Sequence, residues 1–275
     1  MTTKAFVIGH PIAHSRSPLI HGTWLAEHGI DGSYEAIDVA PDALPAFFER
    51  LRGGEFAGGN VTIPHKEAVF ALCDEVDPLA LSIGAVNTLI ARDGRVTGTN
   101  TDYLGFLGNL DQGAPNWSDG AKPAIVLGAG GASRAILVAL ASRSIPVILL
   151  NRTRETADRL AQELDGDITV APIDAFNDVA PHAGLVVNTT SVGMHGSRFE
   201  NLDLSRLQLG SLVTDIVYSP LVTPLLADAQ KLGLQTVDGL GMLLHQAVPG
   251  FAAWFGVTPQ VSAQLRARIE ATLGH

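Results

Sequence analysis

The stretch "AIVLGAGGASRA", residues 124–135, decides the fold, because a continuous apolar run leads into a glycine-rich turn. The run predicts a buried strand, and the residues after the glycines predict a helix. The turn supplies Gly128, Gly130 and Gly131, with Ser133 where a third fingerprint glycine would stand. Such glycines let the backbone approach a pyrophosphate at the helix N-terminus, although they also serve packing alone. The stretch therefore predicts a dinucleotide site in a Rossmann-type sheet.

The residues that follow the next predicted strand indicate which dinucleotide binds. An NAD-selecting site places Asp or Glu there, to bind the ribose 2′-OH. This chain has Asn151, Arg152, Thr153 and Arg154 instead. Arginine matches phosphate geometry, and Asn and Thr hydrogen-bond phosphate and ribose, whereas the alternative is a solvated helix start with surface arginines. The sequence thus favours NADP.

Strands and helices alternate on both sides of this stretch. Unbroken apolar strands between helices predict a parallel sheet covered on both faces, and the segment 111–123, rich in Gly, Pro, Asn, Asp and Ser, is the candidate linker between two domains. Two final helices, at 241–256 and 260–274, are expected to pack back on the first domain. The first half predicts strands at 5–9, 33–39 and 58–64, a hairpin over 85–101 with Asp93-Gly94 at its turn, and helices at 18–29, 42–54, 65–76 and 102–110.

Composition bounds the class of protein. The chain has 275 residues, 46% of them hydrophobic, which suits two packed domains. Its net charge of −10 repels nucleic acid and anionic membranes, so we expect a small-molecule partner. The single cysteine, Cys73, is expected to be a buried structural thiol on an amphipathic helix. The sequence has no signal pattern and no apolar run near the ~20 residues of a membrane span, so a cytoplasmic location is expected.

Two residues of the first half are candidates for the proton transfer that accompanies hydride chemistry. Lys66, in "NVTIPHKE", is predicted in the first turn of a helix, where a cation opposes the helix dipole. That is an unusual place for a purely structural lysine. Asp102, in "GTNTDYLGF", begins a predicted helix, and its alternative role is a plain N-cap. The two residue types form a proton-transfer pair if the fold brings them together.

The segment "PIAHSRSPLIHG", residues 11–22, carries two serines close together. Ser17 before Pro18 is typical of an N-cap and first helical residue, whereas Ser15 lies outside that cap. Two hydroxyls on one loop are suited to holding a carboxylate. Histidine spacing fits no zinc pattern, so no metal is expected. The histidines are expected to be hydrogen-bonded loop or helix residues: His10, His14, His21 and His65.

Together these segments resemble the shikimate dehydrogenase family, NADP-dependent enzymes that reversibly reduce 3-dehydroshikimate to shikimate in aromatic amino acid biosynthesis. The motifs occur in family order over nearly the whole chain: "PIAHSRSPLIH", "GGNVTIPHKE", "GAVNT", "NTD", "GAGGASRA", "NRT", "NTTSVGM" and "DGLGMLLHQA". The resemblance implies an α/β, two-domain fold. Residues 1–102 would form the substrate-binding and catalytic domain, 103–238 the NADP-binding Rossmann domain, and 239–275 C-terminal helices that return to the substrate domain.

The resemblance also implies the roles of individual residues. Lys66 and Asp102 would be the catalytic pair, and Ser15 and Ser17 would bind the substrate carboxylate. The substrate ring would be held by Thr62, Lys66, Asn87, Asp102 and Gln246, with Tyr218 nearby. NADP would be held by Gly128, Ala129, Gly130, Gly131, Ala132, Asn151, Arg152, Thr153, Arg154, Ile216 and Gly239.

The chain departs from the family pattern at three places. Thr99 stands where many members have Asp, and Tyr103 replaces the glycine after Asp102. Thr156 occupies the usual place of a basic residue, which leaves the phosphate contact of Arg154 open. The alternatives are a quinate/shikimate or amino-shikimate dehydrogenase and, from a different class, a non-catalytic NADP-binding regulator, against which an intact Lys66 and Asp102 argue. A monomer or homodimer is expected.

Overall fold

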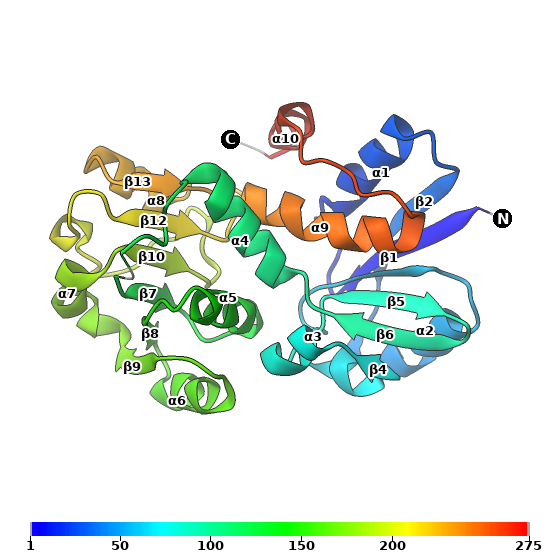
Figure 1. The fold of residues 1–275 in the computed structure, drawn as a ribbon, viewed down its shortest axis with the longest axis horizontal. Helices are drawn as coiled ribbons and strands as arrows, with labels where there is room; N and C mark the ends of the chain where they lie inside the picture. Colours follow the sequence, from blue (N-terminus) through cyan, green and yellow to red (C-terminus); the bar gives the residue numbers. More distant parts are fainter. Residues whose placement is uncertain (1, 121, 274–275) are drawn as a thin grey trace. The chain divides into compact units, whose positions relative to one another are not determined.

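In the computed structural model, which describes residues 2–120 and 122–273, the chain forms two compact units (Figure 1). The first comprises Met1–Asp102 and Leu244–Ile269, and the second comprises Tyr103–Leu243 with the chain from Glu270 onward. The predicted linker at 111–123 is wrong, since helix α4 (Asp102–Gly113) begins at the boundary and the segment lies within the second unit. Apolar residues of α4 are buried in that unit's core, which anchors the helix there.

The second unit is built on a fully parallel sheet with the order β13-β12-β10-β7-β8-β9. Chain order reverses between β7 and β10, and such a switch point is where open α/β sheets bind ligands. This confirms the predicted Rossmann-type sheet. The strands are β7 (Ala124–Leu127), β8 (Val147–Asn151), β9 (Ile168–Pro172), β10 (Leu185–Asn188), β12 (Leu212–Asp215) and β13 (Gln235–Val237), with β11 (Val192–His195) outside this sheet.

Helices cover both faces of this sheet, as the continuous apolar strands predict. Ile125 and Val126 are adjacent on β7 and point to opposite faces, so each belongs to a different apolar cluster. One cluster joins β7 to α4, α5 (Gly131–Ser142) and α6 (Arg154–Glu163), and the other joins it to α7 (Phe176–Val179) and α8 (Pro224–Lys231).

The first unit contains a mixed sheet with the order β2-β1-β3-β5-β6-β4. Strands β5 and β6 form the predicted hairpin, and Asp93 (φ 51°) and Gly94 (φ 74°) adopt the left-handed conformation at its turn. Strand β3 pairs antiparallel with β5 and parallel with β1. The strands are β1 (Thr3–Gly9), β2 (Gly32–Asp38), β3 (Gly58–Val61), β4 (Glu75–Val76), β5 (Thr88–Arg92) and β6 (Arg95–Thr99).

Helices also cover the two faces of the mixed sheet. Phe6 and Ile8 of β1 pack with α2 (Leu44–Arg52), while Tyr34 and Trp254 belong to the cluster on the opposite face. The remaining helices are α1 (Ser17–Glu27), α3 (Pro78–Ile83), α9 (Leu240–Phe255) and α10 (Ala263–Glu270). Short 3-10 helices occur at Pro41–Ala43, Ala68–Leu72, Ile173–Ala175, Ala180–His182 and Leu204–Arg206.

The predicted helix at 65–76 is wrong. The chain forms only the 3-10 helix Ala68–Leu72 and then turns into the edge strand β4. Asp74 explains the change: its backbone N–H donates to Val96 O at 2.9 Å, and its carboxylate accepts the Val96 N–H at 2.8 Å. Pairing with β6 therefore overrides the amphipathic pattern. Cys73 was expected to be buried on an amphipathic helix, but it is half-buried directly after the 3-10 helix. Burial still raises the pKa of its thiol to about 12.

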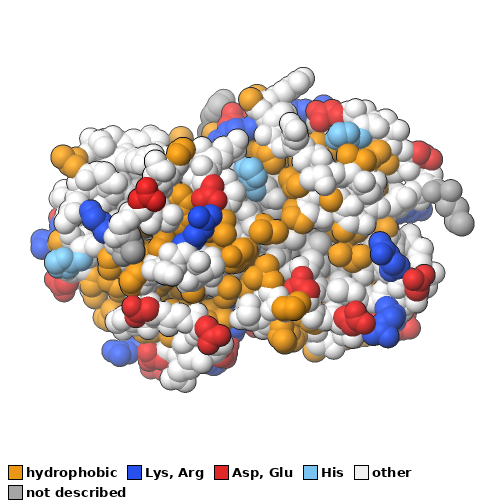
Figure 2. Space-filling model, viewed as in Figure 1, with side chains coloured by type: hydrophobic (Ala, Val, Ile, Leu, Met, Phe, Trp, Pro, Cys, Tyr) orange, Lys and Arg blue, Asp and Glu red, His pale blue; other side chains and the backbone are white. Residues whose placement is uncertain are grey.

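Among the described residues, no helix has both the length and the apolar character that a membrane span requires. Acidic and basic side chains are interspersed over the face drawn in Figure 2.

Candidate active site

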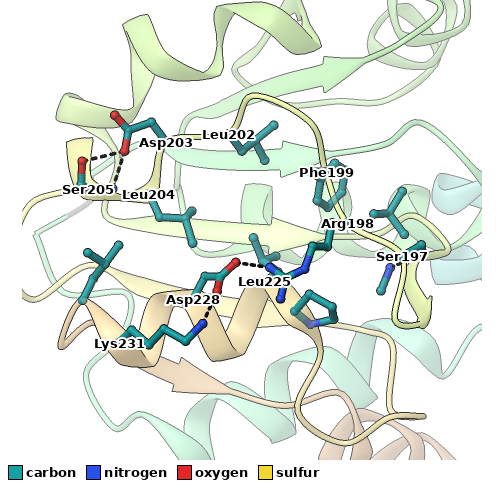
Figure 3. Close-up of a pocket in the computed structure, with 14 residues that line it drawn as sticks. Ser197, Arg198, Phe199, Leu202, Asp203, Leu204, Ser205, Leu225, Asp228 and Lys231 are labelled. Carbon is teal, nitrogen blue, oxygen red and sulfur yellow. Dashed lines mark hydrogen bonds and ion pairs between the residues drawn. The ribbon is translucent and has the colours of Figure 1, made fainter.

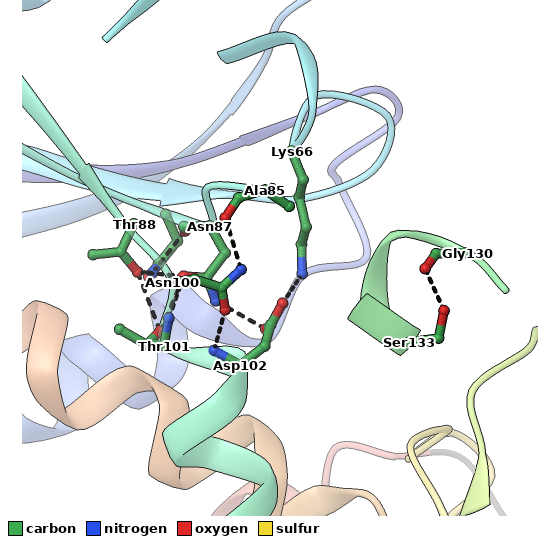
Figure 4. A network of polar contacts seen from close by, with 10 residues as sticks. Lys66, Ala85, Asn87, Thr88, Asn100, Thr101, Asp102, Gly130 and Ser133 are labelled. Carbon is green, nitrogen blue, oxygen red and sulfur yellow. Dashed lines mark hydrogen bonds and ion pairs between the residues drawn. The ribbon is translucent and has the colours of Figure 1, made fainter. Parts of the chain in front are cut away.

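Lys66 and Asp102 form an ion pair in the first unit (Figure 4). Lys66 lies in the turn between β3 and the 3-10 helix Ala68–Leu72, so its expected place in the first turn of a helix is wrong. Asp102 begins α4, and its side chain is 3% exposed, against 16% for Lys66. A buried carboxylate that keeps a partly exposed ammonium beside it is suited to moving a proton at the ammonium nitrogen.

The second carboxylate oxygen of Asp102 is held by Asn87. Asn87 Nδ2 donates to Asp102 Oδ1 at 2.8 Å, and Asn87 Oδ1 accepts the backbone N–H of Thr101 at 2.8 Å. The Asp102 backbone N–H is in turn accepted by Asn100 Oδ1 at 3.0 Å. Both oxygens of Asp102 are thus engaged by side chains, and the plain N-cap role is not the one the structure shows.

The serine loop precedes α1, and its capping differs from the prediction. Arg16 occupies the N-cap position and Ser17 is the first helical residue, so Ser17 as the N-cap is wrong. The Ser15 hydroxyl accepts the Ser17 N–H at 3.3 Å. Burial raises the pKa of the Tyr34 phenol well above its usual value, and the neighbouring Ser17 side chain and Asn60 partly offset the rise.

The histidines near this loop behave in different ways. His10 Nδ1 lies 2.5 Å from Asp38 Oδ1, and His65 Nε2 lies 2.7 Å from Val39 O, as expected of hydrogen-bonded residues. His14 is exposed. His21 differs: it is fully buried and stacks on Tyr34 with ring centroids 4.0 Å apart, and neither ring nitrogen has a hydrogen-bonding partner among the described residues. Burial lowers the pKa of His21 to about 3.

The other predicted substrate residues lie in both units. Thr62 directly follows β3, and its methyl group lies 2.7 Å from where a Cβ on Gly9 would stand, so only glycine fits there. Gln246 is half-buried on the part of α9 that belongs to the first unit. Tyr218 follows β12 in the second unit and is half-buried. Their contacts with substrate stay predictions.

The glycine turn occupies the carboxyl end of β7 in the second unit. Gly128 has φ +103°, and a Cβ there would stand 2.6 Å from Thr190 Cγ2. Gly130 is the N-cap of α5, and a Cβ on Gly130 or Gly131 would meet nothing within 4 Å. The helix N-terminus is therefore open to a ligand group, which fits a dinucleotide pyrophosphate. Ala129 and Ala132, within the same turn, are half-buried.

Ser133 explains how the turn holds its shape without a third glycine. Its hydroxyl donates to Gly130 O at 2.5 Å, and the residue is fully buried. The side chain closes the first turn of α5 rather than pointing at a ligand.

The polar residues after β8 lie around the start of α6. Asn151 Nδ2 donates to Thr153 O at 2.8 Å, and Thr153 is the N-cap of α6. Arg152 and Arg154 are both exposed, and Arg154 Nε lies 3.4 Å from Asp158 Oδ2. Cations at a helix N-terminus oppose the helix dipole, whereas a bound phosphate would be attracted both to the arginine side chains and to the positive end of the dipole. The chemistry of these residues fits the 2′-phosphate of NADP.

Ile216 and Gly239 meet through their backbones. A Cβ on Gly239 would stand 2.5 Å from Ile216 O, so glycine is required for this approach. Asp215, just before Ile216, accepts hydrogen bonds from Asn188 Nδ2 at 2.9 Å, Val217 N at 2.9 Å and Thr223 Oγ1 at 2.7 Å. Burial raises the pKa of Asp215, and these bonds partly offset the rise. The cluster fixes the loop that presents Ile216.

A pocket of about 330 Å³ lies elsewhere on the second unit, between α8 and the chain that follows β11 (Figure 3). Asp228 at its rim is shared by Arg198 at 2.5 Å and Lys231 at 2.8 Å. None of its lining residues is among the predicted site residues. Among the described residues, no group of three or more His, Cys, Asp or Glu side chains is placed to hold a metal ion.

Comparison with known proteins identifies the family. Two family models match the chain: the shikimate dehydrogenase substrate binding domain over residues 7–89 and shikimate / quinate 5-dehydrogenase over residues 115–242. A shikimate dehydrogenase (NADP(+)) of Mesorhizobium japonicum is 55% identical over 273 residues, covering 99% of this chain and 97% of that protein.

Solved structures agree. Shikimate 5-dehydrogenase from Thermus thermophilus, in complex with NADP(H) and shikimate, matches with a TM-score of 0.87 and 38% identity, covering 97% of this chain and 99% of that chain. Quinate dehydrogenase from Corynebacterium glutamicum, in complex with NAD, matches with a TM-score of 0.90 and 30% identity, covering 98% and 99%.

The doubly wound sheet with its glycine turn defines a Rossmann-type dinucleotide-binding protein, joined to a second α/β unit in which Lys66 pairs with the buried Asp102. The chain belongs to the shikimate dehydrogenase family. The resemblance predicted from the motifs is therefore confirmed.

Sequence reasoning missed several residues that support the pair. Tyr34, Asn60, Thr88 and Asn100 all hydrogen-bond within the first unit, yet none was predicted as a site residue. Asn60 and Thr88 lie inside the quoted motifs "GGNVTIPHKE" and "GAVNT". The signal that would have found them is a polar residue in a strand otherwise built of apolar and small residues.

Tyr103, one of the departures from the family pattern, is partly buried against the apolar core of the second unit. Thr99 lies on β6, and its carbonyl accepts the Asn87 N–H at 3.1 Å. Both departures are accommodated by ordinary packing and sheet pairing.

Proposed function

We propose that this chain is an NADP-dependent shikimate dehydrogenase, an oxidoreductase that reversibly reduces 3-dehydroshikimate to shikimate in aromatic amino acid biosynthesis. The observation that carries the proposal is the ion pair of Lys66 with the buried Asp102, in a chain 55% identical to an NADP-dependent shikimate dehydrogenase over nearly its full length. A non-catalytic NADP-binding protein has no need for such a pair.

When bound, NADPH would supply a hydride to the carbonyl carbon of the substrate. The carbonyl oxygen then gains negative charge and must gain a proton. Lys66 donates that proton from Nζ, and Asp102 holds the ammonium in place and stabilises its charge. In the reverse direction the neutral Lys66 amine would accept the hydroxyl proton, while the hydride would leave the carbon for the oxidised dinucleotide. Asn87, bonded to Asp102 Oδ1, keeps the carboxylate oriented.

The remaining polar groups of the first unit orient the ring. The hydroxyls of Ser15 and Ser17 bind the substrate carboxylate, while Thr62, Asn87 and Gln246 bind ring hydroxyls together with the catalytic pair. Tyr218, a residue of the second unit, is a further proposed substrate residue. The first unit accordingly acts as the substrate domain.

The second unit acts as the NADP domain. Gly128, Ala129, Gly130, Gly131 and Ala132 bring the backbone to the pyrophosphate at the start of α5. Four residues at and after the end of β8 bind the adenosine ribose and its 2′-phosphate: Asn151, Arg152, Thr153 and Arg154. Ile216 and Gly239 contact the rest of the cofactor. With its net charge of −10, the chain is proposed to act without nucleic-acid or membrane partners. A cytoplasmic location and a monomeric or homodimeric state are also proposed.

The test is to incubate the purified chain with shikimate and NADP and to follow absorbance at the NADPH band. Steady production of NADPH supports the proposal, and its absence contradicts it. The second candidate is a quinate dehydrogenase, favoured by the structural match to the Corynebacterium glutamicum enzyme. Parallel reactions with quinate, and with NAD in place of NADP, separate the two.

A further inference from the structure

We propose that Thr88 is a positioning residue for the reaction, because its hydroxyl joins the Tyr34–Asn60 pair to Asn87 and so holds the Asn87 amide on Asp102. The inference rests on the proposed function of Lys66 and Asp102. Thr88 acts through Asn87, and its role is to keep the catalytic carboxylate oriented.

The mixed sheet places these residues side by side. Asn60 on β3 is the register partner of Thr88 on β5, and Asn60 also pairs with Val7 of β1. Tyr34 lies on β2, directly across β1 from β3. Its hydroxyl donates to Asn60 Oδ1 at 2.6 Å, and Asn60 Nδ2 donates to Thr88 Oγ1 at 3.0 Å.

The bonds continue from Thr88 to the catalytic carboxylate (Figure 4). Thr88 Oγ1 donates to Asn87 Oδ1 at 2.9 Å, and Asn87 Nδ2 donates to Asp102 Oδ1 at 2.8 Å. Four hydrogen bonds, through the side chains of Asn60, Thr88 and Asn87, thus connect the phenol beside the serine loop with the carboxylate beside Lys66.

The orientation of each amide follows from groups that play only one role. The Thr101 backbone N–H can only donate, so Asn87 must present its oxygen there and its Nδ2 to Asp102. The backbone carbonyl of Asn87 can only accept, and its oxygen lies 3.4 Å from Asn60 Nδ2. Asn60 therefore presents its side-chain oxygen to Tyr34. Thr88 accepts from Asn60 and donates to Asn87 Oδ1 at 2.9 Å. The Thr101 hydroxyl lies 3.2 Å from both Thr88 Oγ1 and Asn87 Oδ1, so the shorter contact directs the Thr88 proton to Asn87. Each of the four hydrogen bonds from Tyr34 to Asp102 therefore has its donor on the Tyr34 side.

Burial gives this arrangement its energetic weight. Thr88 is 1% exposed, Asn87 4% and Asp102 2%, so bulk water does not replace a missing partner. Hydrogen bonds aligned in one direction polarise one another, and this strengthens the last donor, which faces the carboxylate. This donor faces Asp102 Oδ1, while Asp102 Oδ2 pairs with the Lys66 ammonium.

The experiment compares Thr88→Val, Thr88→Ser and wild type with saturating NADP and varied shikimate. Valine keeps the branched shape but lacks the hydroxyl, whereas serine keeps the hydroxyl. We expect Thr88→Val to lower kcat about three- to ten-fold, the loss of one buried hydrogen bond, with little change in KM. Thr88→Ser should recover most of the wild-type kcat.

A matched control and a second variant exclude trivial causes. Thr97→Val removes a threonine hydroxyl from β6 of the same sheet and should leave kcat unchanged. Tyr34→Phe removes the first donor and keeps a ring on His21, so it should lower kcat in the same direction and to a smaller extent. If Thr88→Val fails to fold, Tyr34→Phe decides: an unchanged kcat overturns the inference. Equal losses in Thr88→Val and Thr88→Ser also overturn it, because they indicate packing alone.

A readout without turnover separates this inference from the proposed function. The side-chain amide protons of Asn87 are observed by NMR without ligands and assigned by their loss in Asn87→Ala. In Thr88→Val, the signal of the Asn87 amide proton that is donated to Asp102 should move upfield, and this proton should exchange faster with solvent. Neither change is expected in Thr97→Val. An unchanged signal overturns the positioning role. A wild-type chain that does not oxidise shikimate contradicts the proposed function alone.

Discussion

The Lys66 ammonium and the Asp102 carboxylate form an ion pair although 36 residues separate them in the sequence. Lys66 follows β3, and Asp102 follows β6 at the start of α4. The two residues meet because β3 and β6 both pair with β5, which places their ends at the same region of the sheet.

Removing the ammonium tests the catalytic role directly. We expect Lys66→Ala to lower kcat by about 10²–10⁴-fold, the usual contribution of a positioned proton-transfer group. NADP affinity should stay near the wild-type value, because the proposed cofactor residues lie in the other unit. Lys4→Ala, on the exposed side of β1, is the matched control. Steady-state kinetics and NADP titration measure both quantities, and a near-normal kcat in Lys66→Ala contradicts the assignment.

Replacing Arg152 tests the choice of dinucleotide. We expect Arg152→Ala to weaken NADP binding roughly 10- to 150-fold, as for a lost charged hydrogen bond, and to leave NAD binding almost unchanged. Arg154→Ala is the internal comparison, since the Arg154 guanidinium already lies 3.4 Å from Asp158 and should contribute less. Fluorescence titration with both dinucleotides gives the affinities. Equal losses for NAD and NADP would show that Arg152 does not read the 2′-phosphate.

Two glycines of the same turn separate folding from cofactor binding. Gly130→Ala places a Cβ in open space at an ordinary φ of −96°, so the melting temperature should hardly change while NADP affinity falls. Gly128→Ala forces a side chain into a φ of +103° and against Thr190, which should destabilise the chain by about 1–3 kcal/mol. Thermal unfolding and NADP titration are measured for both. Normal NADP affinity in Gly130→Ala argues against close backbone approach by the cofactor.

Substrate choice tests the serine loop. Quinate carries an additional hydroxyl on the carbon that bears the carboxylate, so this hydroxyl must fit beside Ser15 and Ser17. The Ser15 hydroxyl already accepts the Ser17 N–H, and the Ser17 side chain lies next to the Tyr34 phenol. A buried hydroxyl left unpaired costs about 1–3 kcal/mol, so kcat/KM for shikimate should exceed that for quinate by one to two decades. Comparable values for the two acids in one preparation would contradict this account.

His21 predicts how stability depends on pH. Burial lowers the pKa of His21 from 6.5 to about 3, so the folded state binds this proton more weakly than the unfolded state. The resulting stability is fully present above pH 6.5 and is lost as pH falls toward about 3. His21→Phe keeps the stack on Tyr34 and removes two unpaired nitrogens, so its free energy of unfolding should fall less over that range. His14→Phe changes an exposed position, so its free energy of unfolding should change with pH as in the wild type. Urea unfolding at several pH values measures this free energy for each variant.

Local features of the sequence predicted much of this protein, because they depend on near neighbours in the chain. The apolar run before Gly128 predicted the buried strand β7, and Asp93-Gly94 predicted the hairpin turn. Motifs in a fixed order predicted the family. Backbone sterics and hydrophobic periodicity act over a few residues, so a single sequence contains them in full.

Tertiary structure decided what depends on distant partners. The pattern at 65–76 favoured a helix, yet pairing of Asp74 with Val96 made an edge strand, and Lys66 lies in a turn. The N-cap of α1 is Arg16, whereas the sequence predicted Ser17. The sequence marks Asn60 and Thr88 only as polar residues within apolar strands, and the register of β3 with β5 joins them into a path toward Asp102. The physical reason is that sheet pairing and buried hydrogen bonds exist only once strands far apart in sequence lie side by side.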